Sequence, residues 1–190
     1  MNPVSRLVIL ALFACALWIV HAVNWVSGNA LTLAFGLMPR RVDGLDGIVF
    51  MPLLHGSFGH VASNTVPLLV MGTLLVVTAT RALTRVNGVI VLGGGTATWL
   101  FGSSAIHVGA SGLVFGWFGF LIARGVVDRS PITVVVALLI GFVYGALIWG
   151  VLPGRPGVSW EAHFFGVLAG IAAAWIVPSG VRRPSLRARG

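Results

Sequence analysis

Long apolar stretches, rather than short alternating ones, dominate the chain. Runs bounded by arginine, proline, glycine or asparagine form six such stretches, at about 7–25, 61–80, 88–106, 111–127, 132–150 and 161–177. Each approaches the ~20 apolar residues that a helix needs to cross a bilayer, within a range of about 17–25. The pattern therefore predicts an all-α fold, a polytopic membrane protein built as a bundle of six transmembrane helices.

Little of the chain remains for a soluble domain, so we expect a single membrane domain over 1–190. The one long connection, 27–59, mixes apolar residues with Arg40, Arg41, Asp43 and Asp46, which favours a segment lying in the membrane interface. The first stretch is longer than the ~7–15 apolar residues of a signal peptide, and no clear cleavage site follows it, so we expect it to remain as a span.

Composition narrows the class of protein. Hydrophobic residues make up 57% of the 190 residues and charged residues only 8%, whereas roughly 25% charged residues is ordinary for a soluble domain. This excludes a cytosolic enzyme and a disordered tail, and the single cysteine excludes an internal disulfide. The net charge of +8 would suggest nucleic acid in a soluble protein.

The arginines instead indicate membrane topology. All twelve basic residues are arginines at the ends of apolar runs, and a six-span model places nine on one side and three on the other. By the positive-inside rule, both termini and the basic tail 178–190 are then cytoplasmic. The expected partner of this charge is the anionic lipid bilayer, with no nucleic acid.

The carboxylates exclude several mechanisms. All four acidic residues lie in loops or at span ends: Asp43, Asp46, Asp128 and Glu161. An intramembrane aspartyl dyad is therefore excluded, and a proton-coupled carrier, which usually needs an intramembrane carboxylate, is disfavoured. Because no His-Glu-x-x-His motif and no Cys/His cluster occurs, we expect no metal site, and nothing indicates a cofactor.

Neutral polar residues near the span ends are the remaining candidates for chemistry. His60 and Asn64 are four residues apart and share one helix face, where they can donate hydrogen bonds to a developing oxyanion. A helix–helix hydrogen bond is the alternative. Ser111 opens the fourth stretch near free backbone N–H groups, which suits a nucleophile, although a capping serine is the simpler interpretation.

Helix packing can connect this serine to a base. His163 lies at the same end of the sixth stretch as Ser111 does on the fourth. Both stretches carry Gly-x-x-x-Gly steps that allow close backbone approach: Gly112 with Gly116, and Gly166 with Gly170. If these faces touch, a nucleophile–base hydrogen bond forms. Glu161 is about 200° around the helix from His163 and cannot orient its ring, so the site would be a dyad without a carboxylate.

Three motifs in this order resemble the rhomboid intramembrane serine proteases in their minimal six-span, prokaryotic form. They cover most of the chain and read His55-x4-His60-x3-Asn64, Gly109-x-Ser111-Gly112 and Ala162-His163-x2-Gly166-x3-Gly170. The resemblance implies that Ser111 is the nucleophile and that His163 is the general base and acid.

The resemblance also implies supporting roles. His60, Asn64 and the Ser111 N–H would form the oxyanion hole, with Gly109 beside it and His55 as a supporting hydrogen-bonding residue. Phe115 matches a position at which an aromatic ring stacks on the catalytic histidine. The family often carries a Trp-Arg pair in its first long loop, and Pro39-Arg40-Arg41 stands here instead, which leaves the anchoring of that loop open.

The expected function is that of an intramembrane serine endopeptidase in the plasma membrane. The resemblance implies single-span membrane proteins as substrates, cut near the extracytoplasmic face through a Ser–His dyad. One alternative is a catalytically silent rhomboid-like factor for binding or quality control of membrane proteins. Such factors usually lack the serine or the histidine, and both are present here. A small transporter or channel is disfavoured by the absence of an internal repeat. The oligomeric state is left open.

Overall fold

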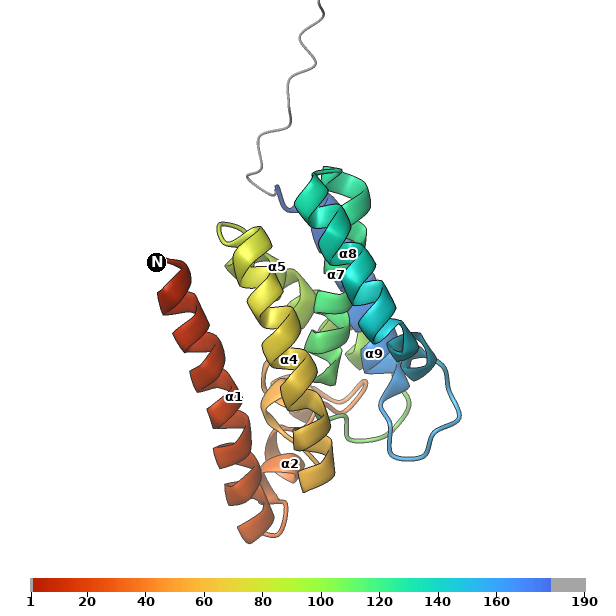
Figure 1. The fold of residues 1–190 in the computed structure, drawn as a ribbon. Helices are drawn as coiled ribbons and strands as arrows, with labels where there is room; N and C mark the ends of the chain where they lie inside the picture. The colour runs from red at the N-terminus through yellow and green to blue at the C-terminus, as the bar shows by residue number, and fades with distance from the viewer. Residues whose placement is uncertain (1, 179–190) are drawn as a thin grey trace, which may run out of the picture.

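The computed structural model describes residues 2–178, and these residues fold into helices with one isolated antiparallel bridge between Leu37 and His107 (Figure 1). The expected basic tail lies almost entirely outside the described residues. The elements in chain order are α1 (Pro3–Val26), α2 (Ala30–Phe35), η1 (Val42–Gly44), α3 (Gly47–Phe50), η2 (Met51–Leu53), α4 (Phe58–Ala79), α5 (Leu83–Gly88), η3 (Val89–Gly94), α6 (Gly95–Phe101), α7 (Ser111–Asp128), α8 (Pro131–Tyr144), η4 (Gly145–Val151) and α9 (Trp160–Ile176).

Local sequence signals set several helix starts. The Asn2 side chain accepts a hydrogen bond from the Ser5 N–H at the start of α1, and Ser57 accepts one from the His60 N–H at the start of α4. Ser130 caps α8 in the same way. Such side chains satisfy first-turn N–H groups that have no partner within the helix.

Within residues 2–178, four helical segments are long and apolar enough to cross a membrane: α1, α4, α7 and the segment Pro131–Val151 formed by α8 and η4. Helix α9 is apolar but shorter, and α5, η3 and α6 follow one another without a break, with a π-helical turn in the middle. The all-helical membrane architecture agrees with the sequence pattern, whereas the number of six crossings stays a prediction.

The third predicted stretch, 88–106, is misplaced. The helical segment begins at Leu83 and ends at Phe101, so that residues 102–106 lie in a loop. Gly102 donates the last helical hydrogen bond of α6, from its N–H to the Thr98 carbonyl, and its own extended backbone (ψ 159°) then ends the helix. Apolar composition alone did not reveal this stop, because Ala105 and Ile106 continue the apolar run after the helix has ended.

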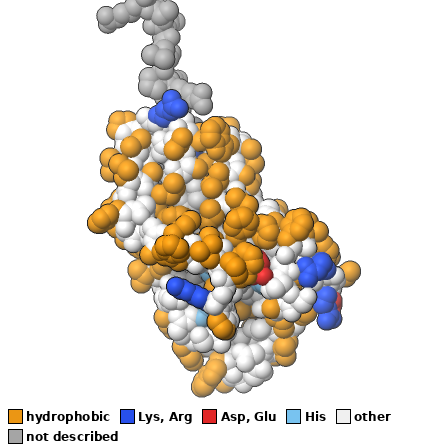
Figure 2. All heavy atoms as spheres, turned by 90° about the vertical axis from the view of Figure 1, so that its right-hand side faces the viewer, with side chains coloured by type: hydrophobic (Ala, Val, Ile, Leu, Met, Phe, Trp, Pro, Cys, Tyr) orange, Lys and Arg blue, Asp and Glu red, His pale blue; other side chains and the backbone are white. Residues whose placement is uncertain are grey.

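The outer surface is strongly apolar. Large hydrophobic side chains are exposed on the long helices, including Phe142 at 91%, Trp175 at 67% and Leu12 at 63%. Figure 2 shows hydrophobic side chains spread over most of one face of the molecule. Exposure of this extent is stable in lipid and would cause aggregation in water, which supports a membrane location.

The long connection between α1 and α4 is held by its own arginine. The Arg40 guanidinium donates to the Gly102 carbonyl at 2.6 Å and to the Ser104 hydroxyl at 3.2 Å. In return, the Trp99 indole N–H donates to the Arg41 carbonyl at 2.9 Å. These bonds tie the connection to the end of α6, in a chain whose first loop lacks a Trp-Arg pair.

Helix α7 is the centre of the bundle, with α4, η3, α8 and α9 around it (Figure 1). Most of its residues are buried. At the end away from Ser111, Arg124 and Asp128 form a buried ion pair with an Nε–Oδ2 distance of 3.2 Å. Arg124 also donates to the Ala174 carbonyl at 2.7 Å, which links α7 to the last turn of α9.

The two Gly-x-x-x-Gly steps lie where α7 and α9 meet. A Cβ atom added to Gly166 would collide with the Gly112 carbonyl oxygen, and one added to Gly170 would collide with the Gly116 carbonyl oxygen. These collisions are with backbone, which cannot move aside as a flexible side chain can. The glycines therefore set the distance between the two helices.

Gly170→Ala should destabilise the protein by about 1–3 kcal/mol, because overpacking at the α7–α9 contact outweighs the ~1 kcal/mol that alanine gains over glycine in a helix. Gly88→Ala is the matched control, since nothing lies within 4 Å of its added Cβ, and it should be neutral or stabilising. Thermal unfolding in detergent measures both. Equal effects of the two substitutions would contradict the proposed role of the contact.

Candidate active site

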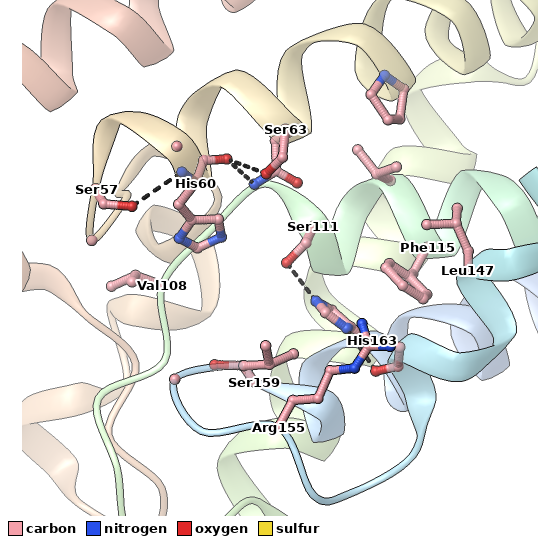
Figure 3. Close-up of a pocket in the computed structure, with 18 of the residues that line it drawn as sticks. Ser57, His60, Ser63, Val108, Ser111, Phe115, Leu147, Arg155, Ser159 and His163 are labelled. Carbon is pink, nitrogen blue, oxygen red and sulfur yellow. Dashed lines mark hydrogen bonds between the residues drawn. The ribbon is translucent and has the colours of Figure 1, made fainter.

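Ser111 and His163 lie side by side at the contact between α7 and α9 (Figure 3). Ser111 is the first residue of α7, and His163 lies in the first turn of α9. The Ser111 Oγ atom is 2.8 Å from His163 Nε2, and the two residues are 9% and 8% exposed. The sequence suggested this pairing, and the structure brings the two side chains within hydrogen-bond distance.

The second ring nitrogen of His163 determines which atom is the donor in the hydrogen bond between Ser111 and His163. His163 Nδ1 is 2.9 Å from the Gly150 carbonyl oxygen in η4. Because a carbonyl can only accept, Nδ1 carries the hydrogen and Nε2 is left as the acceptor for the Ser111 hydroxyl. The Gly150 carbonyl thus orients the imidazole, a role that sequence reasoning missed, because a backbone carbonyl leaves no mark in the residue pattern.

An aromatic ring holds the imidazole from one side. The Phe115 ring stacks on His163 with a centroid distance of 4.0 Å and an interplanar angle of 4°. Glu161, by contrast, accepts a hydrogen bond from the Ser103 N–H at 3.0 Å and orders the loop after α6. The histidine is therefore positioned by a carbonyl and a ring, with no carboxylate bonded to it among the described residues.

The pair opens into a cavity of about 600 Å³. Residues from α4, α7, η4 and the loop before α9 line it; those that carry a polar or charged side chain are Ser57, His60, Ser63, Asn64, Ser111, Arg155, Ser159 and His163. Among the described residues, Arg155 is the one lining residue with a permanent charge. Figure 3 shows it on the loop beside His163.

His60 and Asn64 face this cavity from α4. The Asn64 side-chain amide donates to the His60 carbonyl at 3.0 Å, so in this conformation it is bonded within its own helix. The structure thus brings both residues to the cavity that holds Ser111, without a hydrogen bond between either side chain and the serine among the described residues.

Gly109 allows His60 to approach the serine loop. Its φ of +125° is a conformation that favours glycine, and an added Cβ would lie 2.7 Å from His60 Nε2 and 3.3 Å from Ser111 Oγ. The Gly109 N–H donates to the Met51 carbonyl at 2.9 Å, which connects the loop before α7 to η2.

His55 lies behind the site, fully buried in the connection before α4. Its Nε2 atom accepts a hydrogen bond from the Ala110 N–H at 3.3 Å, and its carbonyl accepts one from His21 Nδ1 at 3.1 Å. Burial lowers the pKa of His55 to about 4, and repulsion from the nearby His60 adds to this effect. His55 is therefore neutral at physiological pH and able to accept the Ala110 bond.

The lowered pKa of His55 predicts a loss of stability in acid. The unfolded chain takes up a proton near pH 6.5, whereas the folded chain resists it down to about pH 4, so the free energy of unfolding falls by up to roughly 3 kcal/mol as pH drops through this window. In His55→Gln, whose amide oxygen accepts the same bond but does not titrate, this fall should be smaller. Unfolding in detergent at pH 4 to 7.5 measures it, and equal slopes for the two proteins would refute the assignment.

Comparison with known proteins identifies the family of the chain. The family model for the Rhomboid domain matches residues 42–180. Over 180 residues the chain is 37% identical to an uncharacterized protein of Mycobacterium tuberculosis, covering 90% of this chain and 75% of the relative. An uncharacterized protein of Mycobacterium leprae is 33% identical over 180 residues, covering 90% of this chain and 71% of the relative. The apolar helices and these matches together show that the chain is a multi-pass membrane protein that belongs to the rhomboid family.

Proposed function

We propose that this protein is an intramembrane serine endopeptidase that uses Ser111 and His163 as a catalytic dyad. The observation that carries the proposal is the 2.8 Å hydrogen bond from Ser111 Oγ to His163 Nε2, with His163 Nδ1 held by the Gly150 carbonyl. The rhomboid family consists generally of intramembrane serine proteases, which supports the proposed protease function.

In the first half of the reaction, Ser111 Oγ attacks the scissile carbonyl carbon as His163 Nε2 takes the hydroxyl proton. The tetrahedral intermediate collapses to an acyl-serine when His163 returns that proton to the leaving amine. In the second half, His163 Nε2 takes a proton from water as that water attacks the ester carbonyl carbon. The second tetrahedral intermediate then breaks its bond to Ser111 Oγ, His163 gives the proton to that oxygen, and the carboxyl product leaves. Positioned acid–base catalysis of this kind contributes roughly 10²–10⁴-fold.

The oxyanion would form beside the start of α7. The backbone N–H of Ser111, in the first turn, has no partner within its helix and lies at the positive end of the helix dipole. Asn64 and His60 supply further donors from the facing wall of the cavity. For this, the Asn64 amide exchanges its bond to the His60 carbonyl for one to the oxyanion, a contact worth about 10²–10³ in kcat.

The proposed membrane topology places this chemistry near the extracytoplasmic face. The uninterrupted helical segment from Leu83 to Phe101 and the apolar helix α9 would add two crossings to the four long helical segments. With both termini cytoplasmic, as the arginine distribution indicates, the dyad opens outward in the plasma membrane. We expect single-span membrane proteins as substrates, admitted by movement of α8, η4 and the loop 151–159.

The dyad assignment is tested by labelling in membranes with a fluorophosphonate, which reacts with activated serines. The intact protein should label, Ser111→Ala should fall to background, and His163→Ala should label about 10²–10⁴-fold more slowly, because it lacks the base. Ser63→Ala is the matched control, since Ser63 lines the same cavity and donates to the His60 carbonyl rather than to the dyad. Equal labelling of all four proteins would contradict the dyad assignment, and labelling of all four at background would support a catalytically silent binding factor instead.

The labelling rate should also depend on pH. A general base must be neutral to accept a proton, so labelling should slow once the pH is low enough to protonate His163. The loss should be reversed when the protein is returned to pH 8, which separates titration from unfolding. A labelling rate that stays constant down to the lowest pH at which the protein remains folded would remove His163 from the role of base.

A further inference from the structure

A second cavity, of about 360 Å³, lies between α1, α4, α5 and α7, beside the C-terminal half of α4. It shares no lining residue with the cavity that holds Ser111. We propose that it is a binding site for one anionic glycerophospholipid, with an acyl chain along the apolar wall and the phosphate at Arg6. This proposal does not depend on the proposed protease activity.

Apolar side chains form nearly the whole wall of this cavity. They come from every surrounding helix, as Phe13 of α1, Leu75 of α4, Leu83 of α5 and Leu113 of α7 illustrate. Water is poorly accommodated here, because a buried water needs two to four polar partners. The volume falls within the roughly 300–1,000 Å³ of ordinary ligand sites. A hydrocarbon chain is the occupant that suits such a wall.

Arg6 supplies a fixed positive charge at one end. Its Nη1 atom donates to the Thr80 carbonyl at the end of α4, which holds the guanidinium in place. Its Nε atom is buried without a hydrogen-bond partner. Its Nη2 atom makes no hydrogen bond to the described residues and is not fully buried, so it can donate to a ligand. A cation at the edge of an apolar cavity favours an anionic group beside it.

Asn87 adds a second donor about one helical turn into α5. Its Oδ1 atom accepts a hydrogen bond from the Trp117 indole N–H at 2.8 Å. Since an indole nitrogen only donates, the atom facing it is the amide oxygen, and the amide N–H₂ is left free. Arg6 and Asn87 both line this cavity, and no carboxylate does so among the described residues.

The free polar groups of the cavity are therefore donors, which identifies the ligand as an acceptor. Phosphate and ester carbonyl oxygens only accept, so a glycerophospholipid satisfies Arg6 with its phosphate and Asn87 with an ester carbonyl. A peptide segment would also bring backbone N–H donors, for which neither side chain offers an acceptor. The positive charge of Arg6 beside an apolar cavity therefore favours an anionic lipid over a peptide as the ligand.

Native mass spectrometry of the full chain in detergent, titrated with phosphatidylglycerol, tests the proposal. One phosphatidylglycerol should bind with highest affinity, and phosphatidylcholine with the same acyl chains should bind more weakly. Arg6→Gln should weaken phosphatidylglycerol binding about tenfold, the scale of one charge-assisted hydrogen bond. Arg85→Gln, on an exposed arginine of α5 outside the cavity, should leave the binding unchanged.

A second pair of variants tests the apolar slot without touching the charge. Ile9 lines the cavity and is 52% exposed, so Ile9→Trp can obstruct it without overpacking the core, whereas Ile19, 63% exposed on the same helix, lies outside it. Ile9→Trp should weaken binding and Ile19→Trp should not. If circular dichroism shows that Arg6→Gln has lost helicity, the comparison of Ile9→Trp with Ile19→Trp becomes the deciding test. Equal binding in both pairs, or equal affinity for the two lipids, would overturn the proposal.

Discussion

Two helix backbones, α7 and α9, touch where glycine leaves no side chain between them, at Gly112 with Gly166 and again at Gly116 with Gly170. In a bilayer the lipid tails are as apolar as the side chains, so helices associate through close packing and hydrogen bonds rather than through the hydrophobic effect. This contact holds the first turns of both helices together, and those turns carry Ser111 and His163. The hydrogen bond between Ser111 and His163 is therefore a consequence of how these two helices pack.

The His163 ring is oriented without a carboxylate, because a backbone carbonyl takes the place of one. A charged partner for His163 would be expensive to bury, whereas the Gly150 carbonyl orients the ring at no such cost. Phe115 limits the remaining freedom of the ring by stacking on it. Charge is instead buried at the other end of the bundle, where Arg124 and Asp128 neutralise each other beside the end of α9. This ion pair therefore lies at the opposite end of α7 from Ser111 and His163.

Short-range signals in the sequence were enough to predict the membrane helices and several of the residues at the site. The apolar runs indicated helices in a membrane, the four-residue spacing placed His60 and Asn64 on one face, and the glycine steps indicated which helices approach closely. The end of the third helix was not predicted, since the extended backbone at Gly102, rather than a change of polarity, ends it. The anchoring of the first loop was likewise open, because it depends on Arg40 reaching the Gly102 carbonyl across more than sixty residues of sequence.

The sequence by itself therefore determined the class of protein and the residues available for chemistry, because hydropathy and helical periodicity are local properties. The tertiary structure decided what those residues can do. The dyad distance, the ring tautomer selected by the Gly150 carbonyl, the approach of His60 to Gly109, and the donor-only cavity around Arg6 all arise between elements that are distant in the chain. Contacts made by backbone carbonyls and by glycine have no side-chain pattern to reveal them, and only the folded arrangement shows which atoms they bring together.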